Sequence, residues 1–525
     1  MTLALDTAYA VALALALPVV PGLALLFACR AAPREPIARL GLAAGLGLAV
    51  IPLVWLFAPG FIQLLFAQAQ PGRITNSVWL LLLAAGGIIL AGRGWSLGVP
   101  WALAGMDKTR TARELTSADD APAKTATIAA LALVLVLAIQ LAARWYAART
   151  VTIPLWADSV HHAMIAELFV RGGRLPDSWL PLAPLATFSY HFGFHGYAAA
   201  VAQMTGLSAT RAVVVVGQVL MVLQALTVAG LAAGLTRRPW AGVAAAIVVG
   251  GLGPMPGTYL TWGRYTQLAG QAVLPAAILA TARAVRGPIH LDDDAVDSIW
   301  RVIGRLAVAA ITVAGLALTH YVVTAFFVVA VGAWWLVDGG RGWRGRAAGL
   351  ARLAVVAALA FAIDLPWLPH FLAGNIDRNA SALVSTELPG AVWGAVSMSY
   401  VLDHFGQWVG IALTAATLLA IAIGLLRRDR VVAVATVWMA GLVAASYPQA
   451  FGLPITGPLK DFTVLIGLYV PAAVAIGAAV APILGRSPSF ALPQHWGRDR
   501  SAKPTREGAR GRLDVLLAAV ALAAL

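Results

Sequence analysis

The segment from His191 to Gly206 reads His-Phe-Gly-Phe-His-Gly-Tyr-Ala-Ala-Ala-Val-Ala-Gln-Met-Thr-Gly, and it decides how the chain is threaded. Its apolar part could form a short membrane span. If it crossed, every later loop would change sides and about twenty basic residues would move outside. Basic residues favour cytoplasmic loops, and histidines are costly within hydrocarbon. We therefore predict a helix that lies at the outer interface or dips into the protein.

The composition of the whole chain predicts a membrane protein. Of its 525 residues, 60% are hydrophobic and 11% are charged, whereas a soluble domain carries about a quarter charged residues. The first apolar run, Ala8 to Cys29, has no basic flank before it and exceeds the length of a signal peptide core, so we interpret it as a retained span. Cys29 is the only cysteine, which excludes disulfides and thiolate metal sites within the chain.

Apolar stretches near twenty residues long predict about fourteen spans, and hence an all-α polytopic transmembrane helix bundle. They cover residues 8–29, 40–58, 77–92, 127–145, 209–235, 240–256, 267–286, 305–319, 322–337, 349–370, 406–426, 430–447 and 462–484, and a final stretch begins near Leu513. We expect N-terminal helices and a cytoplasmic loop over 1–125, and a core over 126–485 with long outer loops at 144–208 and 371–405. A basic cytoplasmic tail over 486–512 and the start of a truncated span over 513–525 follow.

The net charge of +14 is sorted by loop instead of being clustered into one patch with interleaved aromatics, so no nucleic-acid partner is expected. Most of the 37 Lys and Arg fall in segments that we assign to the cytoplasm of a cell (plasma) membrane protein. These segments hold Arg30/Arg34/Arg39, Lys108/Arg110/Arg113, Arg237/Arg238, Arg283/Arg286/Arg301, Arg341/Arg344/Arg346, Arg427/Arg428/Arg430 and the tail from Arg486 to Arg512.

The first long outer loop is the richest polar region. Asp158 or Ser159 is suited to capping a helix that the pair Gly172-Gly173 would end, and Ile165, Leu168 and Phe169 would form a stripe on the membrane surface. On such a helix His161 and His162 share one face with Asp158. The simpler interpretation is that Asp158 is only an N-cap and that the histidines are ordinary interfacial residues.

Further polar groups fall on the same predicted side. Seven of the nine histidines do so or lie at its edge, namely His161, His162, His191, His195, His320, His370 and His404. Tyr190 and His191 suit stacking on a sugar and donation to its hydroxyls, although an interfacial aromatic belt explains them equally well. Arg264, within Trp262-Gly263-Arg264-Tyr265, either snorkels to headgroups or clamps a phosphate.

The remaining outer groups are His320-Tyr321 at a turn, Asp364, the loop residues Asp377, Glu387 and Asp403-His404, and Lys460-Asp461. Neither a glycine-rich phosphate cradle nor a Walker lysine motif is present. His161 and His162 are adjacent, so they cannot hold one metal ion from a helix. A metal site assembled with His191 or His195 stays an alternative, and no metal or cofactor is predicted.

Asp158-Ser159-Val160-His161-His162, Leu175-Pro176 and Tyr190-His191-Phe192-Gly193 resemble bacterial and archaeal membrane proteins assigned to the GT-C class of glycosyltransferases. Trp262-Gly263-Arg264-Tyr265 resembles another motif of those proteins. The topology from about 125 to 485 is also similar to that class, whose first outer loop carries an acidic residue near its start. Protein mannosyltransferases pair two acidic residues there, whereas this chain has one.

The resemblance implies transfer of a sugar from a polyprenyl-phosphate donor to a cell-envelope glycan, lipid or protein on the extracytoplasmic face. Asp158 is expected to act as the base. The donor phosphate would lie near Arg264, His320 or Lys460, while His161, His162, Tyr190 and His191, together with Trp262 and Tyr265, complete the substrate site. The alternatives are a multi-pass transporter and a non-catalytic envelope-assembly membrane protein.

Overall fold

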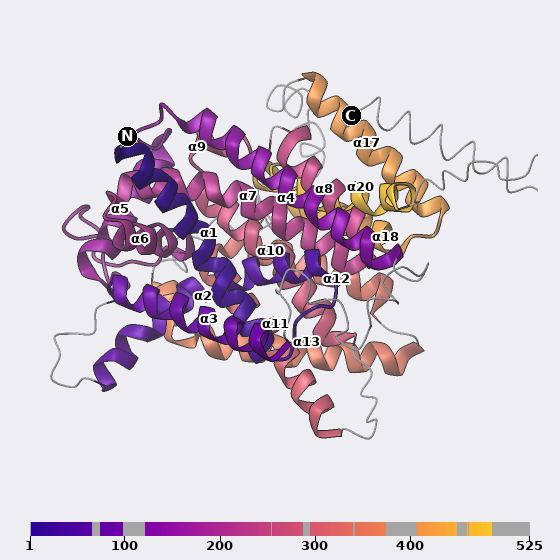
Figure 1. Ribbon diagram of the computed structural model, residues 1–525, viewed down its shortest axis with the longest axis horizontal. Helices are drawn as coiled ribbons and strands as arrows, with labels where there is room; N and C mark the ends of the chain where they lie inside the picture. The colour runs from indigo at the N-terminus through magenta and orange to yellow at the C-terminus, as the bar shows by residue number, and fades with distance from the viewer. Residues whose placement is uncertain are drawn as a thin grey trace, which may run out of the picture.

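The computed structural model describes residues 2–65, 74–97, 121–253, 255–286, 295–339, 342–373, 407–448, 459 and 461–485, and every statement below concerns these ranges. Within them the protein is all-α and contains no strand. Figure 1 shows the helices packed against one another as one bundle, with α5 and α6 at the left edge of the view. The predicted fold class, a polytopic helix bundle, is confirmed.

Nine helices in the described ranges are long and apolar enough to cross a membrane, and shorter apolar helices accompany them. Every predicted span from 8–29 to 462–484 overlaps an apolar helix, whereas the stretch from Leu513 lies outside the described residues. The helices are α1 (Thr2–Ala28), α2 (Pro36–Leu65), α3 (Asn76–Leu97), α4 (Ala121–Ala148), α7 (Ala209–Thr236), α8 (Pro239–Ile247) with the π-helical turn η3 (Val248–Leu252), α10 (Tyr265–Val285), α11 (Ala295–Thr319), α12 (Tyr321–Asp338), α13 (Gly342–Asp364) with the 3-10 turn η4 (Leu365–Trp367), α17 (Gln407–Leu426), α18 (Arg430–Ser446), α19 (Asp461–Leu465) and α20 (Tyr469–Leu484).

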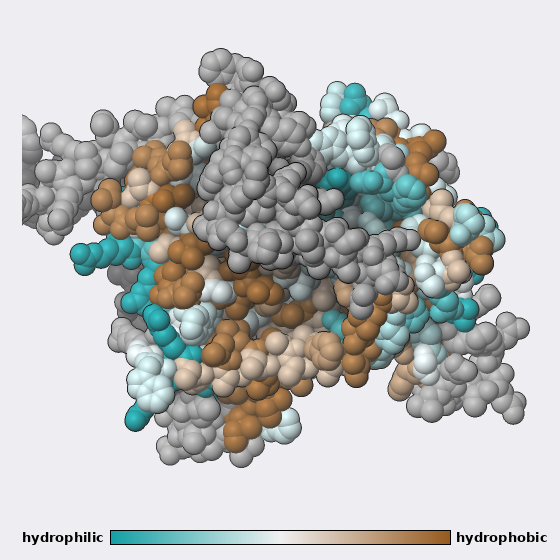
Figure 2. Space-filling model, turned by 180° about the vertical axis from the view of Figure 1, so that it is seen from behind, coloured by the Kyte–Doolittle hydropathy of each residue, from teal (hydrophilic) through white to brown (hydrophobic). Residues whose placement is uncertain are grey.

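The helices divide into central and peripheral ones. In the most apolar window of α7 and of α10, 94% of the residues are buried, against 17% in α4 and in α13. Figure 2 shows hydrophobic side chains over a large part of the face that it draws. A helix that is apolar all round and exposed on one side is suited to lipid contact. We therefore describe α7 and α10 as the core, and α4 and α13 as helices of the rim.

Small residues let the central helices approach closely. A Cβ at Gly41 of α2 would lie 2.7 Å from the Cα of Gly230 of α7, and one at Gly315 of α11 would overlap the carbonyl oxygen of Ala49. Lipid tails are as apolar as the helices, so close van der Waals packing holds such a bundle together. This packing explains Gly41, Gly230 and Gly315, whereas a Cβ at Gly87 of α3 or Gly332 of α12 would meet nothing within 4 Å.

The arginines of several segments predicted to be cytoplasmic meet at one end of the bundle. Asp338, at the end of α12, pairs with Arg286 after α10 and with Arg430 at the start of α18, the latter at 3.2 Å. Arg283 donates to the carbonyl oxygen of Ala31 at 3.1 Å. We call this the arginine-rich end. The 21 residues of α10 span about 30 Å, so Arg264, at its other terminus, lies at the opposite end.

Three helices lie at that opposite end without being candidate spans: α5 (Ala157–Gly172), α6 (Gly193–Thr205) and α9 (Tyr259–Trp262). In α6, every residue from Gly193 to Ala202 is buried. The Nε1 of Trp55 in α2 donates to the carbonyl oxygen of Gly196 at 2.9 Å, and a Cβ at Gly193 would overlap Thr319 of α11. Of the two predicted placements for residues 191–206, the structure therefore has the helix inside the protein.

Two predictions about α5 are wrong. The helix begins at Ala157 after Trp156, whose φ is 71°, and no side chain caps it, so Asp158 stands in the first turn with its carboxylate directed elsewhere. Ile165, Leu168 and Phe169 are buried, with Phe169 packing edge-on to Trp55 at 4.9 Å, so protein covers the stripe instead of lipid. The predicted end is confirmed, because Gly173 closes α5 with a left-handed φ of 62°.

Candidate functional site

Asp158 and Arg264 form an ion pair at the end of the bundle opposite the arginine-rich end. Arg264 Nε lies 3.7 Å from Asp158 Oδ2, and the two side chains are 37% and 46% exposed, respectively. Asp158 comes from the first turn of α5, and Arg264 lies between α9 and α10, 106 positions later in the chain. The structure thus brings together the predicted base and the predicted phosphate ligand.

A close approach of the backbone holds this pair. Gly263 ends α9 with a φ of 62°, a conformation that L side chains rarely adopt. A Cβ there would overlap the hydroxyl of Ser159 and would lie 2.6 Å from the carbonyl oxygen of Leu155. Ser159 is buried and adjoins Asp158. The missing side chain at Gly263 therefore lets the turn that carries Arg264 rest directly on the start of α5.

Behind the ion pair lies a histidine cluster, which we define as His162, His191, His195 and His320. Each of the four is at most 9% exposed. His162 Nδ1 lies 3.1 Å from His195 Nε2, so one ring donates to the other. The rings of His191 and His320 are 4.3 Å apart. The cluster joins α5, α6 and the turn before α12.

Tyr190 connects the cluster to the ion pair. Its ring stacks on His191 at 4.0 Å and meets His195 edge-on at 5.7 Å. Its hydroxyl forms a hydrogen bond with Thr266, and its charge state is influenced by Asp158 and Arg264. Burial raises the pKa of this phenol, and the Thr266 bond offsets the effect in part. Tyr190 is therefore a neutral hydrogen-bonding group at neutral pH.

Burial also keeps the histidine cluster uncharged. It lowers the pKa of His162 to about 3, with smaller contributions from His161 and His320. Burial lowers the pKa of His320 to about 3 as well, helped by Arg264, and it lowers the pKa values of His191 and His195. His320 Nδ1 accepts from the backbone N–H of Val323 at 3.3 Å, which places the proton of this neutral ring on Nε2.

The end of α13 closes the far side of the cluster. Tyr321 donates from its hydroxyl to the carbonyl oxygen of Ser189 at 3.1 Å, and Trp367 Nε1 donates to that hydroxyl at 2.9 Å. Trp367 is buried and stacks on His370 at 4.9 Å. These contacts fix the segment before α6, and with it Tyr190 and His191, against α12 and η4.

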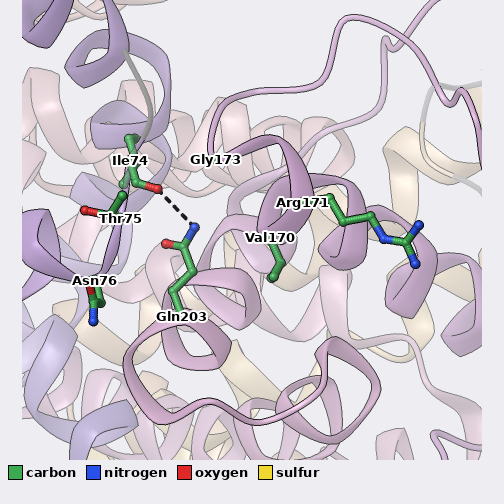
Figure 3. A pocket seen from close by; sticks show the side chains of 7 residues that line it. All are labelled: Ile74, Thr75, Asn76, Val170, Arg171, Gly173 and Gln203. Carbon is green, nitrogen blue, oxygen red and sulfur yellow. Dashed lines mark hydrogen bonds between the residues drawn. The ribbon is translucent and has the colours of Figure 1, made fainter. Parts of the chain in front are cut away.

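A separate pocket of about 350 Å³ opens at the far end of α5 (Figure 3). Gln203 Nε2 donates to the carbonyl oxygen of Ile74 at 3.0 Å, and Trp79 Nε1 donates to Gln203 Oε1 at 3.0 Å. Asp158 lies near the start of α5 and the pocket near its end, which separates them by about 20 Å along the helix axis. Its lining consists of Ile74, Thr75, Asn76, Val170, Arg171, Gly173 and Gln203.

Comparison with known protein families shows which family the chain belongs to. A family of unknown function, DUF6541, matches residues 15–525. The chain belongs to this family. No curated protein matches it. The DUF6541 match includes α5, α6 and the Arg264 turn, so the ion pair and the histidine cluster both lie within the family region.

The predicted site residues of this DUF6541 chain fall into distinct groups. The structure brings Asp158, His162, Tyr190, His191, Arg264 and His320 together at one end. His161 is exposed, whereas the adjacent His162 is buried in the cluster. Tyr265 is fully buried against Phe194, and Trp262 is half-buried. Lys460 lies outside the described residues, as do Asp377, Glu387, Asp403 and His404.

Two contributors were not among the predicted substrate-binding residues: His195, which was named only for an alternative metal site and is the partner of His162, and Thr266, the partner of Tyr190. The available signal was the closeness of His195 to His191 in the sequence, although His191 lies before α6 and only His195 is within the helix. In the described part of the chain, no group of three His, Cys, Asp or Glu side chains is arranged to hold a metal ion.

Proposed function

We propose that the protein is a GT-C type membrane glycosyltransferase that takes its sugar from a polyprenyl-phosphate donor and transfers it to a cell-envelope acceptor outside the cytoplasm. The observation that carries the proposal is the half-exposed pair of Asp158 and Arg264, 3.7 Å apart. A carboxylate suits removal of a hydroxyl proton, and a guanidinium suits a phosphate. Transfer from a phosphate carrier requires both groups at one place.

The transfer step follows from these two groups. Asp158 takes the proton of an acceptor hydroxyl while that oxygen bonds to the anomeric carbon. The bond from that carbon to the phosphate oxygen breaks, and the phosphate leaves with the electron pair. Arg264 stabilises the charge that develops on the leaving phosphate, an effect that is large where water is partly excluded. One carboxylate base predicts inversion at the anomeric carbon, by analogy with inverting glycoside hydrolysis.

The histidine cluster and Tyr190 support binding of neutral hydroxyl groups. Four uncharged imidazoles and a protonated phenol add donors and acceptors next to the ion pair without adding charge. Neutral rings of this kind suit a sugar, which offers hydroxyls and an apolar ring face. Arg264 then stands as the cation at the reacting phosphate in this proposal.

The test uses purified protein in lipid vesicles with polyprenyl-phosphate donors that carry radiolabelled sugars. We expect label to move to an acceptor, and Asp158→Asn to lower that rate by about 10²–10⁴-fold. Asp177→Asn is the matched control, because Asp177 lies in the same loop and pairs with Arg174 instead, at 3.2 Å. Wild-type transfer by Asp158→Asn would contradict the role of Asp158, and uptake of label without transfer would favour a transporter.

A further inference from the structure

The proposed chemistry gives Asp158 and Arg264 different partners, yet in the structure they contact each other. Asp158 must receive a proton from the acceptor, whereas Arg264 must contact the donor phosphate. The 3.7 Å contact involves Nε of Arg264. Asp158 and a bound phosphate would therefore compete for the same guanidinium. A phosphate that binds Arg264 therefore meets a carboxylate already in place.

We infer that the site binds a phosphate monoester or diester by exchange, in which the phosphate displaces Asp158 from Arg264. That the phosphate belongs to a polyprenyl carrier rests on the proposed function; the exchange itself rests on the ion pair. Asp158 thus weakens binding of the donor phosphate in addition to acting as the base. The Asp158 carboxylate becomes available for the acceptor only after the donor phosphate has replaced it as the partner of Arg264.

Two other carboxylates near Asp158 in the sequence have basic partners of their own. Glu167 pairs with Arg171 at 2.6 Å in α5, and Asp177 pairs with Arg174 at 3.2 Å in the loop that follows. The groups that feel the charge of Arg264 across the site are Tyr190, Tyr259 and His320. All three are buried and uncharged at neutral pH. Half-exposed charges exchange partners more readily than buried ones, because water compensates the intermediate positions.

The exchange also links product release to a proton. After transfer, Asp158 carries the proton of the acceptor hydroxyl and no longer attracts Arg264, so the product phosphate remains bound. When Asp158 passes that proton to water, its carboxylate competes for the guanidinium again and the phosphate is bound more weakly, which favours its release. The cycle is balanced, since the acceptor loses one proton, water gains it, and the phosphate keeps the electron pair of the broken bond.

Binding of a fluorescent polyprenyl phosphate to the detergent-solubilised full chain tests the inference without any sugar. Asp158→Asn should tighten binding by about two- to fivefold, the range of an exposed ion pair, and the gain should shrink in high salt. Arg264→Gln should weaken binding, and Arg264→Lys should restore part of it. In the Arg264→Gln background, Asp158→Asn should have a smaller effect. Asp177→Asn and Arg174→Gln, which remove the same charges from the neighbouring pair, should change binding little.

The outcomes separate the inference from the proposed function. Weaker or unchanged binding by a folded Asp158→Asn protein would overturn the exchange. If inorganic phosphate competes as well as polyprenyl phosphate and the same signs hold for both, the exchange stands and the lipid carrier is wrong. Tighter binding of polyprenyl phosphate by Asp158→Asn, together with absence of sugar transfer by the wild type, would keep the exchange and reject the glycosyltransferase.

Discussion

The contact between Gly263 and the start of α5 gives the sharpest structural prediction. Gly263 has a φ of 62°, and a left-handed conformation costs a non-glycine residue about 1–2 kcal/mol. A Cβ there would also overlap the Ser159 hydroxyl and lie 2.6 Å from the carbonyl oxygen of Leu155. Overpacking of this kind costs about 1–3 kcal/mol. Gly263→Ala should therefore lower the free energy of unfolding by about 2–5 kcal/mol.

Gly206→Ala is the matched control for that change. Gly206 has a similar φ of 72°, but nothing lies within 4 Å of its Cβ position. Gly206→Ala should therefore lower the free energy of unfolding only by the cost of the left-handed backbone conformation, about 1–2 kcal/mol. Ser159→Ala combined with Gly263→Ala should recover part of the loss, because it removes the overlapping hydroxyl.

Unfolding by titration with a denaturing detergent measures these differences, and binding of polyprenyl phosphate reports whether Arg264 has moved. Only Gly263→Ala should affect both readouts. Equal stabilities for Gly263→Ala and Gly206→Ala would refute the reasoning, because they would mean that the Arg264 turn does not rest on α5.

Three further predictions concern the rest of the bundle. The pKa of His162 falls from 6.5 to about 3 on folding, so the free energy of unfolding should decrease as the pH falls from 6.5 towards 3, by up to about 1.4 kcal/mol per pH unit. Thermal unfolding at several pH values should show a smaller pH dependence for His162→Gln and an unchanged pH dependence for the exposed His161→Gln. Asp338→Asn removes both ion pairs at the arginine-rich end and should cost about 1–2 kcal/mol without changing phosphate binding; unaltered denaturation would speak against it. With the native cysteine replaced, Arg174→Cys should react with an impermeant maleimide on intact cells and Arg344→Cys should not; the reverse pattern would invert the topology.

The spans could be predicted because their signal is local. An apolar run of sufficient length must be helical in a bilayer, where backbone groups have no water to bond, and the described helices overlap every predicted run up to 462–484. The placement of α6 could be narrowed only to two alternatives. Whether the helix meets lipid or protein depends on partners such as Trp55 and Thr319, which contact Gly196 and Gly193 and lie far away in the sequence.

The errors on α5 have the same origin. Ile165, Leu168 and Phe169 form an apolar stripe whether lipid or protein covers them, so their pattern does not reveal that Trp55 packs on Phe169. Asp158 has the residue type of an N-cap, and its actual contact is with Arg264. The sequence does not predict this contact between residues 106 positions apart, although the chemistry of each side chain made both of them candidate site residues.

The most direct test of the account is the release of polyprenyl phosphate in a single turnover from a polyprenyl-phosphate sugar, measured for the wild type, Asp158→Asn, Arg264→Gln and the double variant. We predict a loss of about 10² or more for each single change. The double variant should lose less than the product of the two losses, because both residues act in one step. Release at the wild-type rate by either single variant would contradict the claim that Asp158 and Arg264 form the reacting site.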